Sequence, residues 1–248
     1  MKCILLCAGY ATRLFPLTEN FPKALLDIEE GKPLLDYILD EVNTIEEIDS
    51  VYVVTNDRYA KHFENWASNK NNIKPITVLN DHTTNNENRL GGVGDLNYTI
   101  EQANIDEDII VIAGDTLFTY KLQDLMDYYK QVKAPVAVTK ELDDINLLRR
   151  FAVAKCDENN RIIDLVEKPA NPESNLGVYA TYIYPKEILK DIKKYLEAGY
   201  NPDAPGYFLE YVVRNYPTYA YKFLGECYDV GTHESLNEVR TLYKNMGM

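Results

Sequence analysis

The sequence contains few of the residues that build metal clusters, disulfide frameworks or redox centres. Its four cysteines are Cys3, Cys7, Cys156 and Cys227, and no two of them form a C-x-x-C pair. The three histidines are scattered along the chain without the short spacing of zinc ligands. We therefore expect no zinc site, buried free thiols and a reducing, cytoplasmic compartment.

Cations and long apolar runs are also scarce. Lysine and arginine together number 26 against 39 aspartates and glutamates, so the net charge is −13. Such a chain lacks the basic face that neutralises nucleic-acid phosphates, and we expect no nucleic-acid partner. The apolar run at residues 4–8 is far shorter than the roughly 20 residues of a membrane span, and its flanks do not suit a signal peptide, so no membrane partner is expected. To bind an anionic substrate, this protein needs well-placed cations or a metal ion.

Short apolar strands alternate with helical patterns over the first 140 residues. Strands are expected at 2–8, 51–55, 76–79, 109–113 and 135–140, and helices at 33–42, 58–70, from after Gly94 to about 103, and 122–130. This alternation predicts an α/β fold with a mostly parallel, Rossmann-like sheet flanked by helices.

The pattern changes near residue 150, where turn residues separate shorter strands. Strands at 151–155, 162–166 and 178–184 indicate an antiparallel excursion in the C-terminal half. Helices at 186–198 and 207–215, a strand near 219–224 and a last helix from about Glu234 follow. No Pro/Gly/Ser-rich linker separates the parts, so we expect residues 1–248 to form a single domain.

The segment at residues 5–26, LLCAGYATRLFPLTENFPKALL, carries the strongest functional signal. A buried strand ends at Ala8-Gly9, where small residues let a ligand approach the backbone and successive N–H groups can cradle phosphate oxygens. Arg13 and Lys23 supply cations for such phosphates. A dinucleotide-binding turn is the rival interpretation, but it requires G-x-G-x-x-G opening a helix, and Pro16 would break that helix.

This segment resembles the signature of the nucleotidyltransferases that act on sugar 1-phosphates, the pyrophosphorylase family. The family loop reads approximately A-[AG]-G-x-G-T-R-L-x-P-L-T and is followed by P-K. Residues 7–18 read CAGYATRLFPLT, with Pro22-Lys23 after them. Ala11 stands where the family usually has glycine, and its methyl group could narrow the phosphate pocket.

Four further matches follow in the family's order. LGGVGDL at residues 90–96 is similar to the L-G-T-A-G-A-L stretch, where a glycine turn and a helix N-terminus meet the nucleoside. Gly114-Asp115 resembles the metal-binding G-D, and Glu167-Lys168-Pro169 resembles the E-K-P that contacts the sugar phosphate. YDVGT at 228–232 resembles the second metal segment, W-x-D-x-G-T. The five matches cover nearly the whole chain.

The resemblance implies a set of site residues and a metal. The implied catalytic residues are Arg13, Lys23, Asp115 and Lys168. The implied nucleotide-binding residues are Leu6, Ala8, Gly9, Arg13, Lys23, Gly91, Gly92 and Asp115. The implied sugar-phosphate-binding residues are Ala152, Glu167, Lys168, Val178 and Tyr182. Mg²⁺ would be held by Asp115 and Asp229, and the nucleotide-binding half would span about 1–140 and the sugar-phosphate-binding half about 141–248.

Several of these residues also have a plain structural interpretation. Asp115 could be a turn residue and Asp229 a solvated or capping one, while Val178 and Tyr182 could be core packing. Arg149-Arg150 is expected to be a surface pair rather than a phosphate clamp. The polar composition of residues 80–89 favours a solvated loop over one that reads the base.

The chemistry of the implied reaction agrees with the residues present. A sugar phosphate has a second pKa of about 6, so its attacking oxygen is already charged at neutral pH. The reaction then needs alignment and charge neutralisation, and the sequence offers no Ser–His or Cys–His pair. We expect an enzyme that makes an NDP-sugar and pyrophosphate from an NTP and a sugar 1-phosphate, with thymidylyl transfer to glucose 1-phosphate as first guess.

Other interpretations stay open on the sequence. Ala11 motivates a catalytically silent family member that binds nucleotide-sugar or regulates a partner. A phosphocholine or phosphonate cytidylyltransferase on the same fold is the third hypothesis. The chain ends 16 residues after Thr232, which we expect leaves no room for a hexapeptide-repeat or acyltransferase domain. The residues do not determine which base or which sugar is used. They also leave the oligomeric state open, and a homo-oligomer is one of the possibilities.

Overall fold

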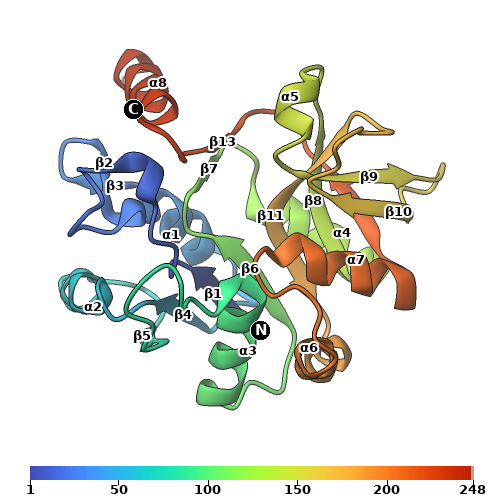
Figure 1. The fold of residues 1–248 in the computed structure, drawn as a ribbon, viewed down its shortest axis with the longest axis horizontal. Coiled ribbons are helices and arrows are strands. Elements are labelled where there is room, and N and C mark those ends of the chain that lie inside the picture. Colours follow the sequence, from blue (N-terminus) through green and yellow to red (C-terminus); the bar gives the residue numbers. More distant parts are fainter. Residues whose placement is uncertain (247–248) are drawn as a thin grey trace.

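The computed structural model describes residues 1–246, and a central sheet runs through this part of the chain with helices on both faces (Figure 1). Its nine strands are β1 (Lys2–Leu6), β4 (Ser50–Thr55), β5 (Ile76–Asn80), β6 (Ile109–Ala113), β8 (Val136–Glu141), β9 (Ala152–Cys156), β10 (Ile162–Glu167), β11 (Leu176–Tyr184) and β12 (Tyr219–Lys222). The order is β10-β9-β11-β6-β1-β4-β5, and β8 lies between β11 and β12.

Strands β5, β4, β1 and β6 are parallel and form the part of the sheet that the sequence predicted best. Along β1, Ile4 faces one core cluster while Cys3 and Leu5 face the other, as the two-residue period of a strand requires. Both faces are covered, which explains why β1 reads as a continuous apolar run. The carboxyl ends of these strands meet at one edge of the sheet, where the loops after them collect.

Strand β11 joins the parallel part to the antiparallel part. Its residues Thr181–Tyr184 pair antiparallel with β6, whereas Leu176–Val178 pair with β9 on the same edge. Along its other edge β11 pairs with β8, with an irregularity between Val178 and Tyr182. The predicted antiparallel excursion is therefore confirmed, and it begins beside the carboxyl end of β6.

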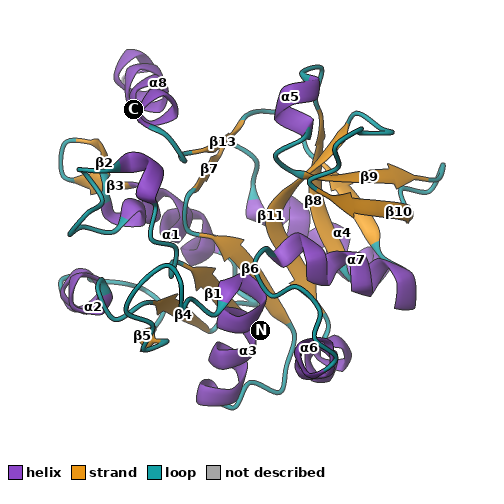
Figure 2. Cartoon of the chain, viewed as in Figure 1, coloured by secondary structure: helices purple, strands orange, loops and turns teal. Residues whose placement is uncertain are grey.

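The helices form two layers that bury the sheet (Figure 2). One core cluster includes side chains from α1 (Leu34–Thr44), α2 (Ala60–Ser68), α4 (Leu122–Val132) and α8 (His233–Met246). The other includes side chains from α3 (Gly91–Ala103), α6 (Lys186–Glu197) and α7 (Pro205–Asn215). The short helix α5 (Ile145–Leu148) lies apart from both layers, before β9. No helix in residues 1–246 is long and apolar enough to cross a membrane.

Two small ribbons were not predicted from the sequence. Strand β7 (Thr116–Phe118) pairs antiparallel with β13 (Cys227–Asp229), and β2 (Asp27–Glu29) pairs with β3 (Lys32–Pro33). These strands are only two or three residues long, so they show no alternation to read. The β7–β13 pair matters most, because it brings residue 229 to the end of β6.

Most predicted boundaries lie within a few residues of the observed ones. The exception is α3, which begins at Gly91 although the glycines up to Gly94 were expected to form a turn before it. Of the four free cysteines, Cys3, Cys7 and Cys227 are buried as expected and Cys156 is half-buried.

Candidate active site

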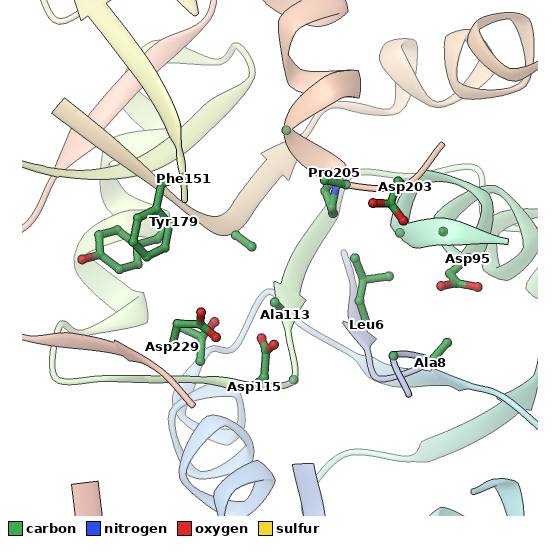
Figure 3. A pocket seen from close by; sticks show the side chains of 18 of the residues that line it. Leu6, Ala8, Asp95, Ala113, Asp115, Phe151, Tyr179, Asp203, Pro205 and Asp229 are labelled. Atoms are coloured by element: carbon green, nitrogen blue, oxygen red, sulfur yellow. The ribbon is translucent and has the colours of Figure 1, made fainter. Parts of the chain in front are cut away.

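A cavity of about 780 Å³ opens at the carboxyl edge of the parallel strands (Figure 3). Its walls come from the loop after β1, the start of α3, the end of β6, the ends of β9 and β10, β11 and the start of α7. All of the site residues that the sequence predicted line this one cavity: Leu6, Ala8, Gly9, Arg13, Lys23, Gly91, Gly92, Asp115, Ala152, Glu167, Lys168, Val178, Tyr182 and Asp229. The fold therefore brings together motifs that are far apart in the sequence.

The loop after β1 lines the cavity and, within residues 1–246, contains backbone donors without partners. Within the described residues, the N–H groups of Gly9, Tyr10 and Ala11 form no hydrogen bond, while the carbonyls around them are held from behind. Asn56 Nδ2 donates to the Ala8 carbonyl at 2.8 Å, and Thr18 Oγ1 donates to the Ala11 carbonyl at 2.8 Å. Carbonyls fixed in this way leave successive N–H groups available to an anion, as a phosphate-binding turn requires.

Ala11 adopts the left-handed conformation that glycine would adopt without strain. Its φ is 47° and its ψ is 41°, just before the short 3-10 helix Thr12–Leu14. For a non-glycine residue this conformation costs about 1–2 kcal/mol. The alanine is thus a tolerated departure from the family loop, since the turn forms with it in place.

Gly91 and Gly92 are explained by close packing at the start of α3. Gly91 has φ of +78°, and a Cβ built on it would lie 2.4 Å from the Pro202 carbonyl oxygen. The N–H of Gly92 donates to the Asp203 carbonyl at 2.8 Å, and that of Val93 donates to the Pro202 carbonyl at 2.9 Å. These N–H groups at the start of α3 are therefore occupied by carbonyls of the segment that leads into α7. The two glycines line the cavity, and their lack of a side chain lets that segment pack against them.

Asp115 and Asp229 lie side by side in the middle of the cavity wall (Figure 3). Asp115 follows β6, and Asp229 ends β13, whose pairing with β7 sets it opposite Thr116. The Val230 N–H donates to the Asp115 carbonyl at 3.0 Å and fixes the two segments to each other. The fold thus joins two carboxylates that are 114 positions apart in the sequence.

Each of these carboxylates faces a cation. Lys23 Nζ lies 2.6 Å from Asp115 Oδ2, and Arg150 Nη2 lies 3.3 Å from Asp229 Oδ2. Burial tends to raise the pKa of Asp115, but the Lys23 ammonium outweighs it and lowers that pKa below its ordinary value. Burial and the neighbouring Asp115 carboxylate raise the pKa of Asp229. Lys23 therefore favours the charged form of Asp115, while burial and the adjacent Asp115 disfavour a charge on Asp229.

The two carboxylates fit a magnesium ion better than a transition metal. Mg²⁺ is usually bound through one or two protein carboxylates together with substrate phosphates, rather than by a complete protein cage. Asp115 and Asp229 supply that donor set next to a cavity with free backbone donors. Among the described residues there is no group of three or more His, Cys, Asp or Glu side chains that could hold a metal alone. Waters and, in the complex, substrate phosphates would complete the coordination.

The other end of the cavity is built around Glu167 and Lys168, where β10 ends. The Glu167 side chain is only 7% exposed, and Lys168 Nζ lies 3.6 Å from its Oε1. Burial raises the pKa of Glu167 above its ordinary value. Gly206 at the start of α7 makes room for this carboxylate, because a Cβ built there would lie 1.7 Å from Glu167 Oε2. Lys168 itself has φ of 47° and projects from a strained turn beside Pro169.

Val178 and Tyr182 are buried in the core and also line the cavity. They flank the irregular part of β11, where the strand changes partner from β9 to β6. They therefore pack in the core and face the cavity at once, and their contact with a sugar stays a prediction. Beside them, the rings of Phe151 and Tyr179 pack with centroids 4.9 Å apart and close the wall (Figure 3).

Several residues were not predicted to line the cavity. Arg149 and Arg150 are both exposed, as expected for a surface pair, but both also line the cavity, and Arg150 Nη2 donates to Asp229 Oδ2 at 3.3 Å. The loop before α3 is largely exposed, as expected, and its Arg89 also lines the cavity and donates to Asp203 Oδ1 at 2.9 and 3.0 Å. The sequence offered one indication of these cavity residues, which is the Arg149-Arg150 pair directly before the predicted strand at 151–155.

Asp95 is a further cavity residue that sequence reasoning did not select. It is 6% exposed, and one of its oxygens, Oδ1, is buried without a hydrogen-bond partner in the described structure. Burial, together with the nearby Asp81 carboxylate, raises the pKa of Asp95 to about 8. Asp81 in turn accepts hydrogen bonds from the N–H and hydroxyl of Thr83. Asp95 therefore adds little negative charge to the wall next to Leu6 and Ala8 at neutral pH.

Comparison with known proteins decides the family. The sequence matches the family described as Nucleotidyl transferase over residues 2–245. The chain belongs to this nucleotidyl transferase family. The resemblance drawn from the five motifs is therefore confirmed, and nucleotidyltransferases of this kind generally use a divalent metal ion.

Two relatives and one solved structure show how far this nucleotidyl transferase resembles known members. A Sulfolobus acidocaldarius protein, provisionally named mannose-1-phosphate guanyltransferase, is 32% identical over 77% of this chain and 50% of its own length. The bifunctional protein GlmU of Methanocaldococcus jannaschii is 33% identical over 78% of this chain and 42% of its own length. The chain thus spans half or less of these relatives. A UDP-glucose pyrophosphorylase complexed with UDP-glucose shares the fold, with a TM-score of 0.83, 22% identity and coverage of 99% and 98% of the two chains.

Proposed function

We propose that this nucleotidyl transferase transfers a nucleotidyl group from an NTP to a sugar 1-phosphate and releases pyrophosphate. One observation carries the proposal: a single cavity has free backbone donors and cations at one end, a buried Glu167 beside Lys168 at the other, and two carboxylates between them. Such a cavity suits two phosphorylated substrates that must meet at a metal.

The nucleotide occupies the end built by the first half of the chain, about 1–140. Leu6, Ala8 and the Gly91-Gly92 pair leave room for the nucleoside, since their side chains are small or lie flush with the wall. The N–H groups from Gly9 onward face the triphosphate. Arg13 and Lys23 neutralise its β- and γ-phosphates and the charge that develops on the leaving pyrophosphate.

The sugar 1-phosphate occupies the end built by about 141–248. Glu167 accepts hydrogen bonds from sugar hydroxyls, which its fixed and buried carboxylate is positioned to do. Lys168 binds the sugar phosphate, and its half-exposed side chain reaches into the cavity from the turn after β10. Ala152, Val178 and Tyr182 form the apolar wall against the sugar ring.

Mg²⁺ is the proposed metal, held by Asp115 and Asp229. Bound there, it would neutralise charge on the substrate phosphates. Lys23 and Arg13 then hold the other phosphates in line, and the cavity walls exclude water from the reacting groups.

No general base is required for this transfer. An acceptor phosphate oxygen that already carries negative charge forms the new bond to the α-phosphorus. The bond from the α-phosphorus to the bridging oxygen breaks, and pyrophosphate leaves with that electron pair. The residues of the cavity contribute alignment and charge neutralisation, and no proton has to move.

The substrate pair within this class is a finer proposal. Thymidylyl transfer to glucose 1-phosphate is the first choice, and guanylyl or uridylyl transfer is an alternative that the names of the similar proteins support. A phosphocholine or phosphonate acceptor is a second alternative, and a silent, nucleotide-sugar-binding role is the third. Retention of Arg13, Lys23, Asp115, Lys168 and Asp229 around one cavity argues against the silent role, because binding alone does not need all five.

A pyrophosphate-release assay over a matrix of acceptors and nucleotides separates these possibilities. The matrix combines ATP, CTP, GTP, UTP and dTTP with glucose, mannose and acetylglucosamine 1-phosphates and with phosphocholine, each with Mg²⁺. Turnover that depends on a sugar 1-phosphate supports the proposal. Turnover with phosphocholine alone would establish the cytidylyltransferase alternative, and absence of turnover with every pair would rule out the enzyme.

A further inference from the structure

The two carboxylates of the cavity are held by cations of different character. The Lys23–Asp115 pair is short, at 2.6 Å, and the lysine side chain is 15% exposed. The Arg150–Asp229 pair is longer, at 3.3 Å, and the arginine side chain is 48% exposed. A single long contact in partial solvent is weak, so Arg150 is held on Asp229 much less firmly than Lys23 is held on Asp115.

Arg150 also lies beside the acceptor end of the cavity. It precedes Phe151, whose carbonyl accepts a hydrogen bond from the Lys168 N–H at 3.1 Å. The backbone that carries Arg150 is therefore fixed to the backbone that carries Lys168, and both long side chains line the same cavity. We therefore expect the guanidinium, which offers the planar fork of donors that phosphates bind best, to be able to reach a phosphate bound at Lys168.

A cation on Asp229 and a phosphate at Lys168 make opposite demands on Arg150. A divalent metal bound to Asp229 would compete with Arg150 for this carboxylate and would repel the guanidinium. A dianionic phosphate at Lys168 attracts it. The two alternatives differ by a rotation of one exposed side chain on a fixed backbone.

We propose that Arg150 exchanges partners during the reaction cycle, neutralising Asp229 in the metal-free protein and binding the acceptor phosphate once the metal is bound. The inference rests on the proposed function and adds a positioning residue to it. It makes metal binding and acceptor binding mutually favourable, because each ligand favours the same position of Arg150.

Mn²⁺ binding to the nucleotide-free full-length protein, followed by electron paramagnetic resonance, tests the first half of the exchange. Arg150→Gln is expected to bind Mn²⁺ about two- to fivefold more tightly than the unmodified chain, because it removes a competitor for Asp229. Arg149→Gln is the matched control. Arg149 donates to the Ala170 carbonyl at 2.9 Å and to no carboxylate within the described residues, so its loss should leave the affinity unchanged.

The acceptor tests the second half. With saturating Mg²⁺, the KM of the best acceptor in the assay matrix is expected to rise about tenfold in Arg150→Gln and to be partly restored in Arg150→Lys. A purely structural residue would not tighten the metal while weakening the acceptor. Equal Mn²⁺ affinity in the unmodified chain and Arg150→Gln would overturn the exchange while leaving the proposed function standing. No Mn²⁺ binding by either protein, even with a nucleoside triphosphate present, would overturn both.

Discussion

Gly206→Ala tests the geometry of the acceptor end most sharply. A Cβ at this position would lie 1.7 Å from Glu167 Oε2 and 2.7 Å from Glu167 Cδ, whereas ordinary contact begins at 3.4 Å. The carboxylate or the start of α7 must therefore shift by roughly 1.5 Å. Overpacking of this kind costs about 1–3 kcal/mol, and a misplacement of about 1 Å in a positioning group costs on the order of 100-fold in rate.

We expect Gly206→Ala to lower kcat/KM for the acceptor by about 10- to 100-fold and to leave the KM for the NTP within about twofold. Gly9→Ala is the crossed control. A Cβ on Gly9 meets nothing within 4 Å, so this variant should keep its stability, yet its methyl group projects where the triphosphate is proposed to lie. It should raise the NTP KM and spare the acceptor.

Steady-state kinetics with each substrate varied, together with thermal unfolding, would check this pair of variants. We expect each variant to affect a different substrate: Gly206→Ala lowers kcat/KM for the acceptor, and Gly9→Ala raises the KM for the NTP. If Gly206→Ala unfolds at a lower temperature but keeps its acceptor kinetics, Glu167 does not bind the sugar. If Gly9→Ala leaves the NTP KM unchanged, the loop after β1 does not hold the triphosphate.

The same cavity supports three other predictions. Asp115→Asn and Asp229→Asn should each remove most activity and Mn²⁺ binding while the unfolding temperature stays near that of the unmodified chain; near-normal rates in both would exclude the two-carboxylate site. Lys168→Ala should raise the acceptor KM more than the NTP KM, and an equal loss for both substrates would contradict its role. The pKa of Asp95 is about 8 in the folded protein against an ordinary value of 3.8, so the unfolded chain binds fewer protons between those values and stability falls as pH rises through that window. Asp95→Asn should therefore raise the free energy of unfolding at pH 8 by roughly 2–5 kcal/mol and change it little at pH 4; a gain of equal size at both pH values would refute the shift.

Local motifs predicted a large share of this site. The small residues after β1, the glycines at the start of α3 and the Glu167-Lys168 turn each lie at one end of an element whose pattern is readable from the sequence. The parallel strands are predictable because both of their faces are buried, so that each strand appears in the sequence as a continuous run of apolar residues. Once those strands are placed side by side, their carboxyl ends must meet at one edge, and the loops that carry chemistry meet there too.

Contacts between distant segments explain what the sequence did not predict. The three-residue strands β7 and β13 have no periodicity of their own, and only their pairing brings Asp229 to Asp115. The approach of Arg150 to Asp229 depends on how the turn before β9 faces β13. The raised pKa of Asp95 depends on Asp81, which comes from another element. Such relations follow from the packing of the whole sheet and not from any one segment.

The central claim is that an acceptor oxygen attacks the α-phosphorus of an NTP within this one cavity. It is tested most directly by following isotopic label from α-³²P- and γ-³²P-labelled NTP with the acceptor that gives the fastest turnover. The account predicts that the α label appears in the nucleotide-sugar and the γ label in pyrophosphate. Appearance of the γ label in inorganic phosphate or on the acceptor, with the α label left in a nucleoside diphosphate, would contradict it.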